Sequence, residues 1–285
     1  MTAAPTIIRT RTELTTQVDA WRCAGLTVGL VPTMGALHAG HLSLVDEMAE
    51  HVDKIVVSIF VNPTQFGEGE DLDTYPRMEL SDQAALAKHP ADLIYAPTVA
   101  EMYPDGTKSD LHITGVTDDL EGAKRPGHFD GMATVVNKLF NHVNPDTAIF
   151  GEKDYQQLLT IKHFVAELGV SVEIIAGKIV REHDGLAMSS RNAYLRAEER
   201  VVASKLNVIL TAMVKKVEAG GDIAAAESVA ATDLIAAGFA SVDYITVRDA
   251  TTLAPITTLD KPARALAVAR IGSVRLLDNM AVTVK

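Results

Sequence analysis

Cysteine, basic charge and long apolar runs are all scarce in this chain of 285 residues. The single cysteine, Cys23, excludes an intrachain disulfide and a cluster of thiolates around a metal. The 26 basic residues against 37 acidic ones give a net charge of −11, which leaves no broad basic surface for nucleic acid. No run approaches the ~18 apolar residues of a membrane span, and residues 1–14 lack a signal-peptide core. We therefore expect a cytoplasmic enzyme without nucleic-acid or membrane partners.

Two familiar phosphate-binding motifs are also missing. The chain has no G-x-x-x-x-G-K-[ST] loop and no G-x-G-x-x-G after a strand, which disfavours P-loop phosphoryl transfer and dinucleotide binding. It has no internal repeat and no low-complexity tract. Its length and its 47% hydrophobic content suit a globular protein of two domains.

Strands and helices are predicted to alternate through the first part of the chain. The expected strands are 26–31, 54–61, 93–96, 147–150 and 172–176. The expected helices are 11–24, 39–51, a short one ending near residue 90, and two with apolar faces over 132–140 and 158–168. A long loop at 62–78 and an edge strand at 111–114 complete this part. The alternation predicts an α/β fold with a parallel sheet and helices on both faces, over residues 1–179.

The pattern changes near residue 180. A polar loop at 181–192 precedes the predicted helices and strands. The helices are expected at 197–219 and 222–237, and the strands at 242–247, 264–269, 274–277 and 281–284. Helices followed by short strands predict a smaller α+β domain over residues 180–285.

The most informative stretch is Val31–His41, where a strand ends in a turn that leads into a helix. If the helix begins near Ala39, the rings of His38 and His41 lie on the same side of its first turn. A phosphate there would meet free backbone N–H groups, the positive end of the helix dipole and two ring donors. The alternative is that these residues only shape the turn.

Two further segments are candidates for binding phosphate. Lys153 begins a predicted helix, where its charge opposes the helix dipole by up to ~1 kcal/mol unless an anion compensates. Ser189, Ser190 and Arg191 supply two hydroxyls and a guanidinium in a loop. The alternatives are an exposed surface lysine and a solvated turn.

Three amide side chains, Asn62, Gln65 and Gln157, lie after predicted strands. An amide binds a carboxylate without cancelling its charge, so an acid held by Gln65 and Gln157 would remain nucleophilic. The loop at 67–75 is a candidate gate that excludes water from a reactive intermediate.

Five motifs occur in the order typical of one enzyme family and cover most of residues 25–195. They are Pro32–His41, Asn62–Phe66, Tyr75–Arg77, Gly151–Gln157 and Met188–Arg191, and Arg125–Phe129 and Leu276–Asn279 also match. On these motifs the chain resembles the AMP-forming pantoate–β-alanine ligases.

The resemblance implies a Rossmann-like nucleotidylyltransferase domain with an H-x-G-H signature, a C-terminal lid domain and a homodimer. It also implies a ligase that joins pantoate to β-alanine through pantoyl adenylate, using ATP and Mg²⁺ and releasing AMP and pyrophosphate.

By matching position, the resemblance assigns a role to each motif residue. ATP would be bound by Met34, Gly35, Ala36, Leu37, His38, Ala39, Gly40, His41, Gly151, Glu152, Lys153, Asp154, Val180, Met188, Ser189, Ser190 and Arg191. His41 would be the proton donor, and Gln65 and Gln157, with Asn62 nearby, would hold pantoate. The charge that develops on the α-phosphorus and on pyrophosphate would be dispersed by His38, His41, Lys153, Ser190, Arg191 and magnesium.

One position departs from the family's pattern. Relatives can carry adjacent acids after the Tyr-Pro-Arg motif, and here only Asp82 is a nearby match. Asp82 is therefore the predicted metal ligand, with magnesium held mainly by the ATP phosphates and water.

Two other functions remain open from the sequence. Another H-x-G-H enzyme would be a nucleotidylyltransferase that makes a dinucleotide, or a tRNA synthetase, although the length, the acidity and the second domain disfavour the latter. The other alternative is a non-catalytic protein that binds a nucleotide or a partner.

Overall fold

The computed structural model describes residues 4–106 and 110–284 and divides into two compact units. Unit 1 comprises Met1–Glu152 and Thr160–Lys178, and unit 2 comprises Lys153–Leu159 and Ile179–Lys285. The domain boundary predicted from the sequence remains a prediction. The sequence pattern did not indicate that the short segment Lys153–Leu159 packs with the C-terminal part of the chain.

Unit 1 is built on a parallel sheet. Its strands are β1 (Thr6–Ile8), β2 (Val28–Thr33), β3 (Lys54–Ile59), β4 (Leu93–Tyr95), β5 (Thr147–Gly151) and β6 (Glu173–Gly177). Its helices are α1 (Arg11–Cys23), α2 (Ala39–Met48), α3 (Glu79–Leu86), α4 (Val99–Met102), α5 (Glu121–Lys124) and α6 (His128–Val143), with α7 (Tyr155–Leu168) shared between the units. Two 3₁₀ turns, η1 (Pro63–Gln65) and η2 (Glu152–Asp154), follow β3 and β5.

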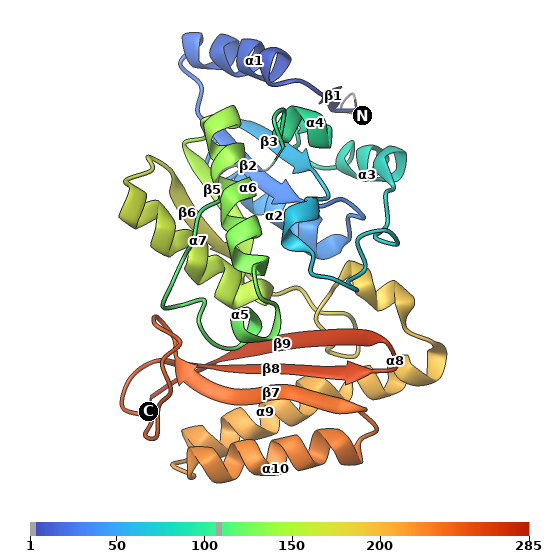
Figure 1. Ribbon diagram of the computed structural model, residues 1–285, viewed down its shortest axis with the longest axis vertical. Coiled ribbons are helices and arrows are strands. Elements are labelled where there is room, and N and C mark those ends of the chain that lie inside the picture. Colours follow the sequence, from blue (N-terminus) through green and yellow to red (C-terminus); the bar gives the residue numbers. More distant parts are fainter. Residues whose placement is uncertain (1–3, 107–109, 285) are drawn as a thin grey trace. The chain divides into compact units, whose positions relative to one another are not determined.

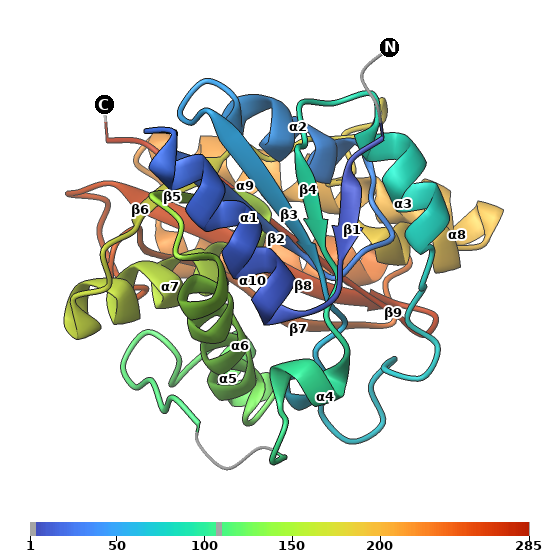
Figure 2. The ribbon, with the colours of Figure 1, turned by 90° about the horizontal axis from the view of Figure 1, so that it is seen from above.

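The strand order is β1-β4-β3-β2-β5-β6, and every neighbouring pair is parallel. The chain builds outward from β2 through β3 to β4, and then returns to place β5 on the other side of β2. This reversal of direction creates a topological switch point between β2 and β5, where open α/β sheets bind their ligands. The predicted Rossmann-like parallel sheet is confirmed (Figure 2).

Helices cover both faces of this sheet, as the alternation predicted. On one face Leu44, Val45 and Met48 of α2, together with Leu86 of α3, share a buried cluster with strand residues. On the other face α1 packs beside α6 (Figure 2). The rings of Phe140 in α6 and Phe164 in α7 lie 6.2 Å apart. The core therefore lies on both sides of the strands, which explains their nearly continuous apolar sequences.

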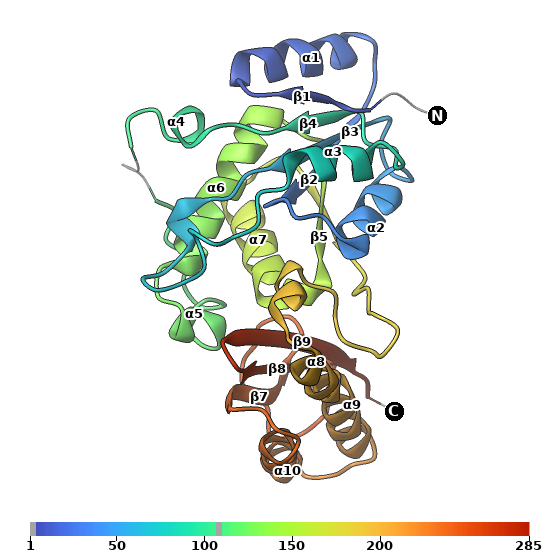
Figure 3. The same cartoon turned by 90° about the vertical axis from the view of Figure 1, so that its right-hand side faces the viewer.

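Two details of unit 1 differ from the prediction. The edge strand expected at 111–114 is wrong, because the N–H groups of Leu111 and Ile113 donate to the side chains of Thr134 and Asp130 in α6 and not to a neighbouring strand. The short strand β1 was not predicted, and it pairs with β4 at the edge of the sheet (Figure 3).

Unit 2 is the predicted α+β arrangement. It contains α8 (Ala197–Ala203), α9 (Lys205–Glu218) and α10 (Ile223–Ala236), the 3₁₀ turn η3 (Ser190–Tyr194), and the strands β7 (Ser241–Asp249), β8 (Ala263–Ile271) and β9 (Val274–Val282). The strands form an antiparallel sheet in the order β7-β8-β9, with α9 and α10 side by side along it (Figure 1).

Two predicted elements of unit 2 are wrong in extent. The helix expected at 197–219 is divided at Ser204 into α8 and α9. The two strands expected at 274–277 and 281–284 form one strand, β9, because Asp278 and Asn279 are buried within it. No helix of the described residues has the length and apolar character to cross a bilayer.

Candidate active site

The two histidines lie where β2 leads into α2. His38 is the N-cap of α2 and the helix begins at Ala39, as predicted. The centroids of the His38 and His41 rings are 4.0 Å apart, with the ring planes tilted by 31°. The spacing of three residues therefore does bring both imidazoles to one side of the first turn of the helix.

Hydrogen bonds fix how each ring is used. Nδ1 of His38 accepts from the N–H of Gly40 at 3.1 Å, and Nδ1 of His41 accepts from the N–H of His38 at 3.4 Å. A neutral imidazole that accepts at Nδ1 carries its proton on Nε2. In that tautomer the donor atom of each ring is Nε2.

A buried carboxylate holds the turn that precedes these rings. Asp82, which is 3% exposed, accepts from the N–H groups of Ala36 and Leu37 at 3.0 and 2.8 Å. Ala36 has a positive φ of 50°, so these two successive N–H groups converge on one anion. Burial raises the pKa of Asp82, and the two backbone N–H groups partly oppose that shift.

The role of Asp82 as a metal ligand remains a prediction. Each of its oxygens already accepts a backbone N–H, which is a structural use of the carboxylate. Within residues 4–106 and 110–284 no three histidine, cysteine or acidic side chains gather as a metal cage.

Gln65 is joined to the histidine turn and to a buried polar network. Its amide donates to the sulfur of Met34 at 3.0 Å, and its oxygen accepts from Asn62 at 3.3 Å. Asn62 is 1% exposed, donates to the carbonyl of Gly131 and accepts from the hydroxyl of Tyr103 at 2.8 Å. The buried Asn62 side chain thus holds the Gln65 side chain in place through a hydrogen bond.

A glycine permits this arrangement. A Cβ at Gly131 would lie 2.2 Å from the carbonyl oxygen of Thr64, so only glycine allows α6 to approach η1 this closely.

A second support for Gln65 was not assigned a role from the sequence. Nδ1 of His128 donates to the carbonyl oxygen of Gln65 at 2.7 Å, and Nε2 of His128 accepts from Arg125 at 3.0 Å. Burial lowers the pKa of His128 to about 4, and the Arg125 charge acts in the same direction. Arg125 in turn pairs with Glu70 through two bonds of 2.7 and 2.6 Å, which anchors the loop at 67–75.

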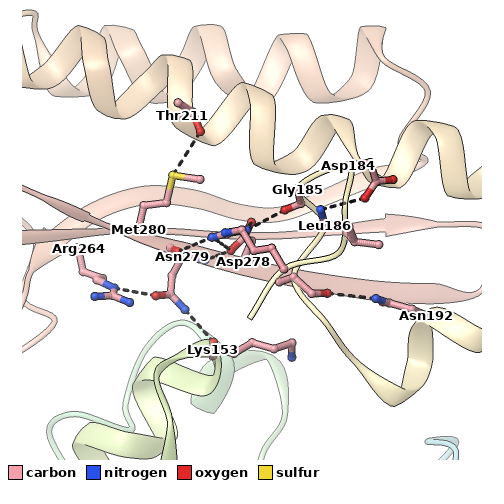
Figure 4. Close-up of polar contacts among 12 residues, drawn as sticks. Lys153, Asp184, Gly185, Leu186, Asn192, Thr211, Arg264, Asp278, Asn279 and Met280 are labelled. Atoms are coloured by element: carbon pink, nitrogen blue, oxygen red, sulfur yellow. Dashed lines mark hydrogen bonds and ion pairs between the residues drawn. The ribbon is translucent and has the colours of Figure 1, made fainter. Parts of the chain in front are cut away.

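The Lys153 segment belongs to unit 2. Lys153 lies in η2, its ammonium is 3.5 Å from Asp154, and its carbonyl accepts from Nδ2 of Asn279 at 2.7 Å (Figure 4). Near it in the sequence, Tyr155 donates its hydroxyl to the carbonyl of Ala250, and the Arg264 guanidinium lies 4.1 Å from the Tyr155 ring centroid. Gln157, two residues further along α7, is half-buried.

The Met188–Arg191 segment follows a short hairpin in unit 2. The N–H of Met188 donates to the carbonyl of Val180, and Ser189 caps η3 by accepting from the N–H of Arg191. Arg200 of α8 pairs with Glu182 and Asp184 on the hairpin. These contacts give Ser190 and Arg191 a defined backbone, and their role in binding ATP remains a prediction.

The topology of unit 1 relates two of the predicted segments. β2 and β5 are neighbouring parallel strands, so the turn at Met34–His41 and the residues Gly151 and Glu152 leave the same edge of the sheet. Leu44 of α2 packs against both Gly151 and Gly177. That Lys153, Gln157 and Met188–Arg191 join this edge in one site remains a prediction.

A parallel sheet with imidazoles and backbone N–H groups at its switch point defines an α/β enzyme of the nucleotide-binding type. The family model for pantoate-beta-alanine ligase matches residues 6–281. This chain belongs to the pantoate-beta-alanine ligase family, and it is a ligase.

Individual relatives agree over nearly the whole chain. The pantothenate synthetase of Paramagnetospirillum magneticum is 53% identical over 282 residues, which are 99% of this chain and 99% of that protein. The pantothenate synthetase structure from Thermus thermophilus has a TM-score of 0.90 and 43% identity, and the match covers 97% of this chain and 99% of that one. The pantoate-beta-alanine ligase of Francisella tularensis, complexed with beta-gamma ATP and beta-alanine, has a TM-score of 0.83 and 33% identity over 97% of each chain.

Proposed function

We propose that the chain joins pantoate to β-alanine in two half-reactions, through an enzyme-bound pantoyl adenylate. ATP-dependent condensation of these two substrates is the activity of the family to which the chain belongs. The observation that carries the mechanism is the pair His38 and His41, stacked at the carboxyl end of β2 with both Nδ1 atoms occupied by backbone N–H groups.

In the first half-reaction a carboxylate oxygen of pantoate attacks the α-phosphorus of ATP. A new P–O bond forms, the bond to the bridging oxygen of the β-phosphate breaks, and pyrophosphate leaves. The Nε2–H groups of His38 and His41 donate to phosphate oxygens, with His41 as the proton donor. The Lys153 ammonium, Ser190 and Arg191 disperse the charge that develops on the triphosphate.

In the second half-reaction the amine of β-alanine attacks the activated acyl carbon. The amide bond forms, the bond from the acyl carbon to the phosphate oxygen breaks, AMP leaves and the amine loses a proton. No covalent protein nucleophile is needed, so neither Ser189 nor Ser190 is assigned that role.

Pantoate is held by Gln65 and Gln157, whose amides leave the carboxylate charged and nucleophilic. Asn62 sets the orientation of Gln65 from its buried position, and Gln65 also lies near the β-alanine site. Magnesium, if bound, would supply positive charge beside the phosphates, and Asp82 is the carboxylate that the sequence pattern predicts as its protein ligand.

Product analysis separates this reaction from the alternatives. AMP and pyrophosphate are expected in equal amounts when ATP, pantoate and β-alanine are all present, and repeated turnover should stop if either acid is left out. A dinucleotide-forming enzyme would retain the nucleotidyl group in its product. A non-catalytic nucleotide-binding protein would fail to exchange labelled pyrophosphate into ATP in the presence of pantoate, and that result would overturn the proposal.

We further propose a homodimer in the cytoplasm, where an ATP-dependent ligase has its substrate. Sedimentation equilibrium of the purified chain tests the dimer, since a single monomeric species across the accessible concentration range would contradict it. Fractionation of cells that express the native chain tests the compartment.

A further inference from the structure

Two adjacent polar residues interrupt the apolar pattern of β9. Asp278 and Asn279 are each 2% exposed, in a strand whose other buried residues include Val274, Leu276 and Val282. Burying a carboxylate and an amide costs free energy unless both are fully hydrogen-bonded. The hydrogen-bond partners of Asp278 and Asn279 therefore indicate the role of these two residues.

Asp278 binds the base of the hairpin that leads to Met188. Its two oxygens accept from the guanidinium of Arg181 at 2.6 and 2.9 Å, a bidentate ion pair. Arg181 also donates to the carbonyl of Gly185 at 3.0 Å, at the tip of the same hairpin. Asp278 thus fixes the hairpin in which the carbonyl of Val180 accepts from the N–H of Met188.

Asn279 binds the other candidate phosphate segment. Its Nδ2 donates to the carbonyl of Lys153 at 2.7 Å, while its Oδ1 accepts from Nε of Arg264 at 2.6 Å (Figure 4). Arg264 in turn covers the ring of Tyr155. The amide is used at both ends, so its orientation and the position of the Lys153 backbone are fixed together.

We propose that Asp278 and Asn279 are positioning residues that set the spacing between Lys153 and the Met188–Arg191 segment for the phosphates of ATP. Asp278 and Asn279 are adjacent in β9, so the hairpin that leads to Met188 and the Lys153 backbone are anchored to neighbouring points of one strand. The N–H of Asn279 also donates to Asp278 at 2.7 Å, which couples the two. This inference rests on the proposed roles of Lys153 and of Ser190 and Arg191 in binding ATP.

The two half-reactions provide the test, because pyrophosphate is present only in the first. Asn279→Ala and Asp278→Asn are expected to slow pantoate-dependent exchange of labelled pyrophosphate into ATP by about tenfold or more, the effect of losing one hydrogen bond that positions a phosphate-binding segment. Transfer from supplied pantoyl adenylate to β-alanine is expected to stay near the wild-type rate. Asp278→Glu, which keeps the charge, is expected to restore part of the exchange.

Asp243→Asn is the matched control. Asp243 lies on β7 of the same sheet, accepts from Nε of Arg275 at 2.6 Å and lies 3.6 Å from Nε of Arg270, and neither ion pair includes a residue of the two segments. Asp243→Asn should lower the free energy of unfolding by a comparable amount and leave the rate of pyrophosphate exchange near that of the wild type. The proposal would be overturned if Asp243→Asn and Asp278→Asn lost exchange equally. It would also be overturned if Asn279→Ala slowed both half-reactions equally, because either result indicates general destabilisation.

Lys153→Ala separates this inference from the function on which it rests. Loss of exchange in Lys153→Ala with normal exchange in Asn279→Ala would overturn the positioning role and leave the ATP site intact. Normal exchange in Lys153→Ala would remove the proposed role of Lys153 itself. If Asp278→Asn does not fold, Asn279→Ala alone decides the outcome, because it removes no charge.

Discussion

The two regions proposed to bind phosphate in this chain are stabilised in different ways. The histidine turn of unit 1 is held largely by near neighbours, such as the bonds from Gly40 to His38 and from Gly35 to Thr33, each two residues apart. The unit 2 segments depend on β9, whose Asp278 and Asn279 bind partners 97 and 126 residues away in the sequence. Asp82 is the distant partner of the histidine turn, 45 residues from Leu37.

This difference indicates which substitutions should disturb each region. A turn made of local hydrogen bonds forms with little loss of chain entropy, and it tolerates substitutions elsewhere in the chain, apart from Asp82. Segments held by distant side chains depend on a folded sheet that has no proposed contact with ATP. The unit 2 segments should therefore respond to remote substitutions, and the histidine turn of unit 1 mainly to substitutions of its own residues.

The largest expected effect is at Lys153. Lys153→Ala should lower the rate of pyrophosphate exchange about 10³-fold, because an ammonium aimed at the developing charge on the triphosphate is lost. Initial rates of exchange with saturating pantoate measure it. Lys162→Ala, an exposed lysine on α7, is the control and should behave as wild type. Near-normal exchange in Lys153→Ala would remove Lys153 from the mechanism.

His41→Ala tests the unit 1 side of the comparison. It should lower exchange about 10²-fold or more, as expected when a positioned proton donor is removed. The melting temperature should change little, since the ring is only partly buried at the first turn of α2. His163→Ala on α7 supplies a matched exposed histidine. A variant as active as His163→Ala would exclude His41 as the donor.

The pH dependence of stability should reveal the buried support of Gln65. Burial lowers the pKa of His128 to about 4, while an unfolded chain has the ordinary value near 6.5. Between pH 4 and 6.5 the unfolded state therefore binds more protons than the folded state. The free energy of unfolding should be highest above pH 6.5 and should fall as the pH is lowered toward 4, by about 3 kcal/mol for this residue.

Urea unfolding from pH 4.5 to 7 measures this slope. His142, whose pKa burial also lowers to about 4, contributes a similar slope of its own. His128→Asn should therefore reduce the dependence on pH without abolishing it, and His142→Asn is the matched comparison. An unchanged slope in His128→Asn would show that His128 is not buried as the neutral ring.

Asp82→Asn should break the distant contact of the histidine turn. An amide presents a single acceptor oxygen to the N–H groups of Ala36 and Leu37, so we expect a loss of about 1–3 kcal/mol in stability together with reduced exchange. The loss of exchange should persist at saturating magnesium. Full rescue by magnesium alone would favour the metal-ligand role over the structural one.

The smallest effect is expected at the loop over 67–75. Glu70→Gln weakens the pair with Arg125 and should cost at most about 1 kcal/mol in stability, but it should speed proteolysis of this loop. Glu79→Gln weakens the similar bidentate pair with Arg9 and is the control. ATP with pantoate should protect the wild-type loop, and identical cleavage with and without them would argue against a gate.

Much of the architecture was predictable because the signals are local. The apolar runs that became β2, β3 and β5, the capping box at Thr10 and Glu13, and the helix start at Ala39 are all readable within a few residues. The strand at 111–114 failed because its backbone N–H groups found side chains of α6, a contact that no local pattern encodes. The division of β9 failed for a related reason, since Asp278 and Asn279 look like a turn until their distant partners are known.

Residue type and short-range spacing establish which chemical groups this chain can use: two histidines three apart at a strand end, a lysine at a helix start, and a Ser-Ser-Arg loop in the order typical of the family. These features can be recognised from the sequence because helix ends and turns form from neighbouring residues. What supports these groups depends on contacts that form in the folded chain. In the folded chain β5 lies beside β2 at the switch point, Asp82 accepts from the backbone of the histidine turn, and Asp278 and Asn279 are buried in β9. These contacts join residues that are distant in the sequence, so they exist only once the chain has folded.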